Sequence, residues 1–597
     1  MAHEFLVYLK EKYKWSADTV VSLSDKAAKK KWSIFHYLYN ADDLSEYGME
    51  ETELLSDLLA FFKQEGRELH YIPDSCNMEF ESVVYSRFGS ASEVVTEYFI
   101  PLHDRVSNTH YVLTKCPDSY DFVSKIESIY AGFDWGLAIC DSRLWAVFKQ
   151  LYIEPMTIRT LAGKLQMEET PLKFTNNRTA EMNMSDIRLM LSRILTSGFE
   201  RRASDVHFIP TATDTDVRFR IDGVYQPYTR IPNEALKRIC KIVMQDAGKP
   251  DHNVNITCKG KFNFEPRPGI KLDMRLSIIP CKYGRDLNIR YLSDKLFTLQ
   301  ETGLSADHIR QYNELLQLPA GILYVTGPVG SGKTSTIFSG VQILAESYKN
   351  VITVEDPVEY TVQGITQVDV DEESGSGLTF ESVLSTVLRH DPDVVLVGEM
   401  RTPEVAKQAM RIANTGRLVI STVHTNDSIG VFERMRSLDV DDYTIGEVSA
   451  AIITQRLVRR LCAHCREPYY VEPNSEEANI FNIHTSKPLK FFKPRGCRYC
   501  MNTGYHGRIA IAEIMVITPD IRTSIQQGAT RAQYESILNK AKFHTMLRDG
   551  LEKAMLGLTS LEELKKYAND IISFRGKPLN DDDISEFVLG RNLYGKN

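Results

Sequence analysis

The chain has 597 residues and a mass of 68.0 kDa, which at about 100–200 residues per domain allows roughly three to five domains. Its composition, 43% hydrophobic and 25% charged, is typical of a soluble globular protein, and 71 basic against 79 acidic side chains leave a net charge of −8. This acidic balance argues against a general nucleic-acid coat, and no apolar run reaches the roughly 18–20 residues of a bilayer-spanning helix. Because 1–15 also lacks the apolar segment of a secretory signal, we expect a cytosolic protein.

The N-terminal region, 1–172, is predicted to be a mostly helical domain that docks on a partner. Its clearest helix is 51–62, where leucines recur at helical spacing up to Phe62. The apolar stripe Leu54–Phe62 is expected to be available for that docking, with packing against the region's own core as the alternative. A polar stretch at 173–184 is predicted to be a linker.

An α+β domain is predicted at 185–300. An amphipathic helix at 185–196 precedes the alternating strand Val217–Ile221, which ends in the turn Asp222-Gly223. Further strands are predicted at 272–278 and 287–292. These strands carry the arginines Arg218, Arg220, Arg275 and Arg290. Taken alone, such residues are more simply explained as surface arginines.

From residue 321 the pattern becomes β-α-β. Short apolar runs rich in β-branched residues lie at Gly321–Thr326, Val351–Val354 and Val394–Val397. They predict buried strands of a mostly parallel sheet, and hence an α/β core at 301–455.

The segment Gly327–Thr334 matches the phosphate-binding pattern G-x-x-x-x-G-K-[ST], between a predicted strand and a predicted helix at 335–346. Glycines let backbone amides turn toward phosphates, and the helix N-terminus adds its dipole. We expect Lys333 to reach the β- and γ-phosphates of a nucleotide and Thr334 to bind Mg²⁺. The candidate nucleotide-binding residues of this loop are Gly327, Pro328, Val329, Gly330, Ser331, Gly332, Lys333 and Thr334.

Acidic side chains follow two of these strands. Glu355, Asp356 and Glu359 come after the second strand, and Glu399 comes after the third. Ligands of open α/β sheets lie beyond the carboxyl ends of the strands, so these carboxylates are expected near the γ-phosphate and Mg²⁺. We favour Glu355 for polarising the attacking water and Glu399 for holding the water shell of the metal, and the reverse division stays open.

His424 follows a further apolar run at 418–420 and is expected at the same edge of the sheet. Such a histidine either senses the γ-phosphate or has a structural role. The sequence leaves both possibilities open.

Four of the ten cysteines form two C-x-x-C pairs, Cys462 with Cys465 and Cys497 with Cys500. Their spacing predicts one closed, structural Zn²⁺ site in a subdomain at 456–513, with a redox dithiol as the alternative. The other cysteines are dispersed and are expected to be reduced. A C-terminal helical region is predicted at 514–575, followed by a tail at 576–597.

Several motifs occur in one order: GPVGSGKT, TVEDPVEY, RHDPDVVLVGEMR, STVHTND, QRLVRRLC and the four cysteines, with SDVHF and VRFRIDG upstream. Together they resemble the secretion ATPases of bacterial type II secretion and type IV pilus assembly, over about 185–570. The resemblance implies a RecA-like P-loop ATPase that uses ATP, Mg²⁺ and Zn²⁺. It also implies a homo-hexamer at the cytoplasmic face of the inner membrane.

The resemblance further implies roles for particular residues. Lys333, Glu355, Glu399 and His424 would be catalytic, Asp356 and Glu359 would complete an acidic box, and the four arginines would contact the nucleotide. The implied partners are an inner-membrane platform protein and, indirectly, the pilin or pseudopilin machinery, with no direct contact to nucleic acid. The cysteines and the long N-terminal region favour extension or secretion over retraction.

Two positions depart from the family pattern. Arg417 replaces the usual histidine after Thr-Gly, and Thr402 replaces the usual aspartate after Gly-Glu-x-Arg. Two other functions remain as alternatives to the motor, namely a DNA-transfer or conjugation ATPase and a non-motor regulatory NTPase.

Overall fold

The computed structural model describes residues 2–30, 34–39, 44–73, 78–80, 99–104, 107–117, 135–148, 177–249, 257–267, 269–292, 296–370, 378–567 and 576–589. The chain divides into two compact units, Met1–Leu292 with Gly496–Gly504 and Ser293–Arg495 with Tyr505–Asn597. Among the helices of the described residues, none has the length and apolar character needed to cross a membrane.

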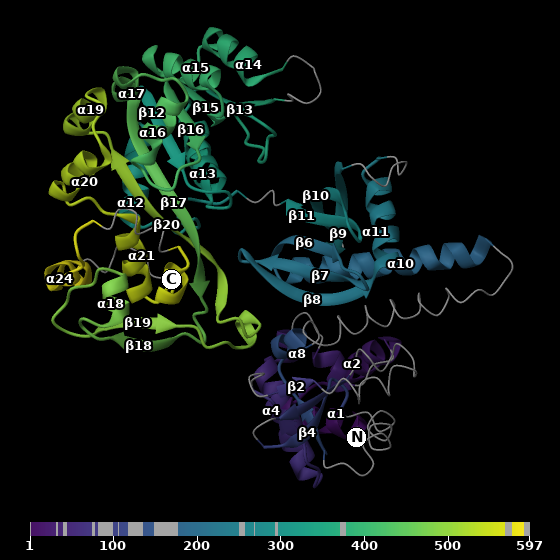
Figure 1. Cartoon of the computed structure of the whole chain (residues 1–597). Helices are drawn as coiled ribbons and strands as arrows, with labels where there is room; N and C mark the ends of the chain where they lie inside the picture. The colour runs from purple at the N-terminus through teal and green to yellow at the C-terminus, as the bar shows by residue number, and fades with distance from the viewer. Residues whose placement is uncertain are drawn as a thin grey trace. The chain divides into compact units, whose positions relative to one another are not determined.

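The N-terminal part of the chain combines helices with a small sheet (Figure 1). The helices are α1 (Ala2–Tyr13), α2 (Ala17–Lys30), α3 (Ile34–Tyr39), α4 (Glu51–Gln64) and α8 (Ser142–Phe148). The sheet has the order β1-β5-β4-β3-β2, with strands β1 (His70–Tyr71), β2 (Met78–Phe80), β3 (Phe99–Asp104), β4 (Thr109–Thr114) and β5 (Trp135–Ile139). These strands are short and widely spaced in the sequence, and the helical periodicity of this region gave no sign of them.

Helix α4 directs its apolar stripe into the core of this same part. Leu54, Leu55, Leu58 and Phe62 are buried there, in one cluster with Phe5 of α1. The stripe Leu54–Phe62 is therefore already covered, which corrects its expected availability to a partner.

The α+β part is an antiparallel sheet with two helices packed against it. Its order is β8-β7-β6-β11-β10-β9, with strands β6 (Ala203–Pro210), β7 (Asp214–Ile221), β8 (Val224–Pro232), β9 (Cys258–Arg267), β10 (Ile270–Cys281) and β11 (Gly284–Leu292). The helices are α10 (Asn177–Glu200) and α11 (Asn233–Asp246). Helix α10 begins inside the predicted linker, because 177–184 contains no proline or glycine to stop it.

The part of the chain that contains the glycine-rich loop 327–334 has a seven-stranded sheet in the order β14-β13-β15-β16-β12-β17-β20. All neighbouring pairs are parallel except β17 with β20. The strands are β12 (Gly321–Thr326), β13 (Val351–Glu355), β14 (Thr366–Asp369), β15 (Val394–Glu399), β16 (Leu418–Val423), β17 (Ser449–Leu461) and β20 (Tyr505–Val516). The mostly parallel sheet predicted from the sequence is thus present.

Both faces of this sheet are buried, which explains why its strands are apolar throughout. In β12, Ile322 and Tyr324 enter one hydrophobic cluster while Leu323 and Val325 enter another. The helices that accompany the sheet are α12 (Ala306–Leu316), α13 (Lys333–Glu346), α14 (Phe380–Val387), α15 (Pro403–Asn414), α16 (Gly430–Ser437) and α17 (Asp442–Val448).

Strands β17 and β20 continue past the sheet as a two-stranded ribbon (Figure 1). Near its far end lie the hairpin β18 (Glu467–Val471) and β19 (Leu489–Lys493), together with α18 (Glu476–Ile480) and η4 (Arg498–Cys500). The C-terminal helices are α19 (Pro519–Gln526), α20 (Arg531–Lys540), α21 (Met546–Met555), α22 (Leu561–Lys565) and α24 (Asp581–Leu589).

A fully buried ion pair fastens α21 to β20. Lys553 Nζ lies 2.7 Å from Asp549 Oδ2 and donates to the backbone oxygen of Ala510, while the amide of Ala512 donates to Asp549. His308 lies 4.0 Å from Asp549, but burial, opposed by the attraction of Asp549, lowers the pKa of His308 to about 4. His308 is therefore neutral at pH 7, and Lys553 supplies the positive charge that Asp549 needs.

Lys553→Met is expected to lower the free energy of unfolding of this unit by about 3–5 kcal/mol, because it leaves a buried carboxylate without its counter-charge. Scanning calorimetry of the full chain measures the effect. Lys540→Met, at an exposed position of α20, is the matched control and should change stability by less than about 0.5 kcal/mol. Equal stability of the two variants would contradict the prediction.

Candidate functional site

The phosphate-binding loop joins the end of β12 to the start of α13. Backbone φ is +144° at Gly327, where a Cβ atom would lie 2.4 Å from the backbone oxygen of Gln455 on β17. Only glycine fits this close approach. Gly330 and Gly332 also have positive φ, so their amides can face inward. Pro328, Val329 and Gly330 form an exposed tip, with Val329 89% exposed, whereas Ser331 is buried.

Lys333 is the first residue of α13 and folds back over the loop. Its Nζ donates to the backbone oxygens of Gly327 at 2.8 Å and Pro328 at 3.1 Å. Burial lowers the pKa of Lys333 to about 8, with attraction from Glu399 opposing that effect and repulsion from Arg456 adding to it. The ammonium group is thus still largely charged at neutral pH. Thr334 follows at a half-buried position.

His424 and Glu399, two of the predicted site residues, are in contact. His424 Nε2 lies 3.1 Å from Glu399 Oε1, and Arg401 Nε donates to Glu399 Oε2 at 2.8 Å. Burial and the charge of Lys333 lower the pKa of His424, while Glu399 raises it. Lys333, Glu399 and His424 therefore form one electrostatic group at the carboxyl edge of the sheet.

The acidic box lies at the same edge, at the end of β13. Glu355 is 5% exposed and accepts hydrogen bonds from Thr353 and Gln367. Asp356 is exposed and lies 3.7 Å from Arg401, which links it to Glu399. Glu359 is also exposed, and its backbone amide donates to Glu355.

The predicted arginines lie on the α+β sheet. The strand pairings place Arg275 opposite Arg290, Arg290 opposite Asp205, and Asp205 opposite Arg220, so these side chains form one row across four strands. Arg290 Nε donates to buried Asp205 at 2.8 Å, and Arg218 pairs with Asp216 at 2.8 Å. The guanidinium of Arg220 lies 4.0 Å from the ring centre of Tyr225.

Sequence reasoning missed two residues of β17 that contact the loops after β12 and β16. Gln455 Nε2 donates to the backbone oxygen of Ser331 at 2.9 Å, and Arg456 Nη2 donates to Asn426 Oδ1 at 3.1 Å. Both belong to the motif QRLVRRLC, which was used only for the family resemblance. Arg401 was missed in the same way, although it follows Glu399 by two positions.

The two departures from the family pattern occupy structural positions. Thr402 is the N-cap of α15, and its Oγ1 accepts from the amide of Val405. Arg417 precedes the first residue of β16, whereas His424 follows the last one, and Arg417 donates to the backbone oxygen of Thr415. The partners of these two side chains are thus Val405 for Thr402 and Thr415 and Asp391 for Arg417.

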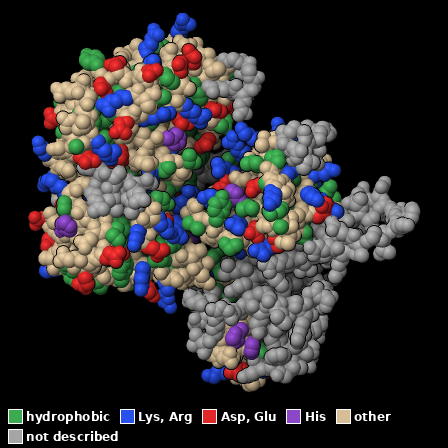
Figure 2. Space-filling view, in the orientation of Figure 1, with side chains coloured by type: hydrophobic (Ala, Val, Ile, Leu, Met, Phe, Trp, Pro, Cys, Tyr) green, Lys and Arg blue, Asp and Glu red, His purple; other side chains and the backbone are tan. Residues whose placement is uncertain are grey.

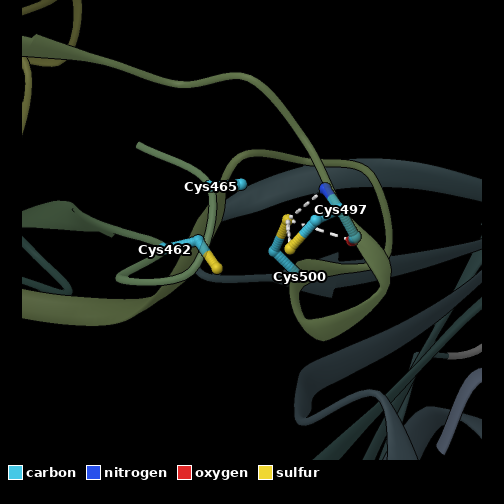
Figure 3. A group of neighbouring side chains, drawn as sticks. All are labelled: Cys462, Cys465, Cys497 and Cys500. Atoms are coloured by element: carbon cyan, nitrogen blue, oxygen red, sulfur yellow. Dashed lines mark hydrogen bonds between the residues drawn. The ribbon is translucent and has the colours of Figure 1, made fainter. Parts of the chain in front are cut away.

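The four cysteines of the C-x-x-C pairs lie together (Figure 3), and their sulfur atoms are all within 4.8 Å of one another. Cys497 Sγ and Cys500 Sγ are 3.8 Å apart, which matches the separation of about 3.8 Å expected for thiolates about 2.3 Å from one tetrahedral Zn²⁺. The backbone amides of Cys497 and Gly504 donate to Cys500 Sγ. Such donors stabilise a thiolate, so the residues fit a structural zinc ion.

The sequence is similar to a known family and to several of its members. Residues 180–566 match the family described as type II/IV secretion system protein. The type IV pilus assembly ATPase PilB of Thermus thermophilus is 34% identical over 418 residues, which cover 68% of this chain and 46% of the Thermus protein. The type II secretion system protein E of Klebsiella pneumoniae is 34% identical over 391 residues, which cover 64% of this chain and 76% of that protein. The type II secretion system ATPase E of Vibrio cholerae is 32% identical over 388 residues, covering 64% and 75%.

The chain belongs to the type II/IV secretion system protein family, because the match extends over more than half of its length. The resemblance and the α/β P-loop fold expected from the sequence are thereby confirmed. The match begins at residue 180, so it does not include the N-terminal part.

Wild-type protein is expected to contain one Zn²⁺ per chain, and Cys497→Ser is expected to release it and lower the melting temperature, because a structural zinc site contributes folding free energy. Metal analysis and calorimetry measure both effects. Cys281→Ser, at an exposed cysteine outside the cluster, is the control and should retain the metal. A metal-free wild-type protein with a full thiol titre would contradict the assignment.

Proposed function

We propose that this chain is a motor ATPase that hydrolyses ATP to ADP and phosphate and drives type IV pilus assembly or type II protein secretion. The observation that carries the proposal is the meeting of Lys333, Glu399 and His424 at the end of three buried parallel strands. A phosphate-binding lysine, a carboxylate and a histidine at one sheet edge can bind a nucleoside triphosphate and act on its terminal phosphate.

Phosphate binding is assigned to the loop 327–334. The carbonyl groups that Lys333 contacts are weaker acceptors than phosphate oxygens, so the ammonium moves to the β- and γ-phosphates when ATP enters. The negative charge of the phosphates raises the pKa of Lys333 and keeps it protonated. Thr334 offers a hydroxyl ligand for Mg²⁺, which neutralises charge on the phosphates when bound.

Water activation is assigned to Glu355, and Glu399 is assigned to the water shell of the metal. Glu355 is buried at the strand end, where a carboxylate has a raised affinity for protons. Glu399 has both oxygens engaged by His424 and Arg401, which fixes its direction. His424 can therefore sense a change at the γ-phosphate through its contact with Glu399.

The arginine row is assigned to the nucleotide within a homo-hexamer. Arg220, Arg275 and Arg290 are aligned on one face of the α+β sheet, and guanidinium groups suit the charge that develops on a transferring phosphoryl group. Asp205 and Asp216 now hold Arg290 and Arg218, so binding of the nucleotide competes with two ion pairs.

The process and partners are proposed from the relatives. Pilus assembly and type II secretion both occur among the names of the matching proteins, so both processes remain open. The proposed partners are an inner-membrane platform protein and, indirectly, pilin or pseudopilin machinery, and the proposed location is the cytoplasmic face of the inner membrane. Acidic and basic side chains intermingle over the face seen in Figure 2, an arrangement unlike the single-signed surface of a nucleic-acid coat.

Lys333→Ala is expected to reduce ATP hydrolysis by roughly a hundredfold or more, because it removes the positive charge that contacts the β- and γ-phosphates.

Glu399→Gln is expected to bind ATP but barely hydrolyse it, because glutamine keeps the size of the side chain and lacks its negative charge. Nucleotide binding measured beside phosphate release separates the two cases, with Lys540→Ala as the exposed control. Wild-type turnover by Lys333→Ala would refute the phosphate-site assignment.

Deletion of 1–172 is expected to remove membrane association in cells that contain all partner proteins, because we assign recruitment to this region. The buried stripe Leu54–Phe62 is not the contact, so the surface of the folded N-terminal part would make it. Full-length Lys333→Ala is the control, as it keeps 1–172 but lacks turnover. If the truncated chain cofractionates with membranes as well as the full-length chain does, recruitment is instead assigned to the cysteine-bearing region.

A further inference from the structure

Two side chains donate to the same oxygen of Glu355. Thr353 Oγ1 lies 2.6 Å from Glu355 Oε1, and Gln367 Nε2 lies 3.2 Å from that atom. Thr353 precedes Glu355 by two positions on β13, so both side chains lie on one face of the strand. Gln367 is the residue directly opposite Thr353 on the edge strand β14.

The orientation of the Gln367 amide is fixed by the backbone around it. Its Oε1 accepts from the amide of Val362 at 2.8 Å, and its Nε2 also donates to the backbone oxygen of Tyr360 at 2.8 Å. The nitrogen must therefore face Glu355. Thr353 is fully buried, and its hydroxyl donates to the carboxylate.

These donors act against the burial of Glu355. Burial raises the pKa of Glu355, hydrogen bonds from Thr353, Gln367 and the amide of Glu359 lower it, and the charge of Glu359 raises it. Further charged groups nearby are Asp356 with Arg401, which follow the ends of β13 and β15, and Asp369, which is paired with Glu355 on β14. Without the donors, a carboxylate in this position would hold its proton to a higher pH.

We propose that Thr353 and Gln367 are positioning residues for Glu355, which keep it ionised and hold Oε1 so that Oε2 faces the attacking water. The inference rests on the proposed function, in which Glu355 is the base. The water oxygen forms a bond to the γ-phosphorus, the bond from the γ-phosphorus to the bridging oxygen of ADP breaks, and a water proton passes to Glu355. A carboxylate that is already protonated cannot accept it.

The test is the pH dependence of single-turnover ATP hydrolysis by the full-length protein with Mg²⁺. Thr353→Val keeps the shape of the side chain and removes the donor, so the acid limb of the rate profile is expected to move up by about one pH unit. At pH values below the acid limb, the rate of Thr353→Val should then be about tenfold lower than the wild-type rate. At pH values above the limb, the two rates should be equal. Thr353→Ser keeps the hydroxyl and should leave the limb within about 0.2 units of the wild-type position.

Gln367→Met supplies an independent second variant, because it removes the other donor at similar length. It also loses the bonds to Tyr360 and Val362, so ATP binding is measured beside hydrolysis to verify the folded site. An unmoved limb in Thr353→Val and Gln367→Met, both with wild-type ATP affinity, would overturn the proposal. An acid limb that moves equally in Thr353→Ser and Thr353→Val would also overturn the proposal. The shift would then come from altered packing, because Thr353→Ser keeps the hydroxyl donor.

Glu355→Gln separates this failure from failure of the proposed function. If Glu355→Gln cannot hydrolyse ATP but Thr353→Val has the wild-type profile, Glu355 remains the base and the positioning role is wrong. If Glu355→Gln hydrolyses ATP at the wild-type rate, the assignment of the base fails, and the positioning role fails with it.

Discussion

In a sheet of parallel strands that is buried on both faces, charged side chains can keep their hydration only at the edge where the strands end. Strands β12, β13, β15 and β16 are apolar almost throughout, and a charged group in their middle would lose its hydration without compensation. Accordingly, Glu355 and Glu399 are the last residues of β13 and β15, His424 directly follows β16, and Lys333 begins the helix after the loop that leaves β12. Each is satisfied there by a specific neighbour, as Glu399 is by His424 and Arg401.

Strand β17 connects this edge to the cysteine cluster. Its Gln455 contacts the phosphate-binding loop, its Arg456 contacts Asn426 beside His424, and Cys462 follows its last residue. The seven steps from Gln455 to Cys462 span about 23 Å at about 3.3 Å per residue in an extended strand. A zinc ion on the cysteines would hold the far end of a ribbon whose near end packs against Gly327, so the two sites share one stiff element.

Local sequence patterns predicted the parts of the site that are built from consecutive residues. The segment 327–334 directly follows β12 and runs into the first two residues of α13, as expected, because a strand, a glycine-rich turn and a helix each have a short-range signature. The pair of hydrogen bonds from Thr353 and Gln367 to Glu355 could not be predicted, since it depends on which residue of β14 lies opposite Thr353. The arginine row has the same origin, because Arg275, Arg290 and Arg220 become neighbours only through the register of β10, β11, β6 and β7. The stripe Leu54–Phe62 shows a different limit: an amphipathic helix has the same pattern whether it covers its own core or a partner.

The departures at Thr402 and Arg417 follow from the same geometry. An N-cap needs a side-chain oxygen that accepts from the first turn of the helix, and threonine provides one as aspartate does, so α15 begins after Glu399 in either case. Thr402 lacks the negative charge of aspartate, and its neighbour Arg401 pairs with Glu399 and lies 3.7 Å from Asp356. Arg417 lies at the opposite end of β16 from His424, about 23 Å away at about 3.3 Å per residue of an extended strand, and it donates to the backbone oxygen of Thr415 in the preceding turn. The arrangement of side chains at the strand ends is therefore compatible with both substitutions, because Thr402 preserves the start of a helix and Arg417 is remote from His424.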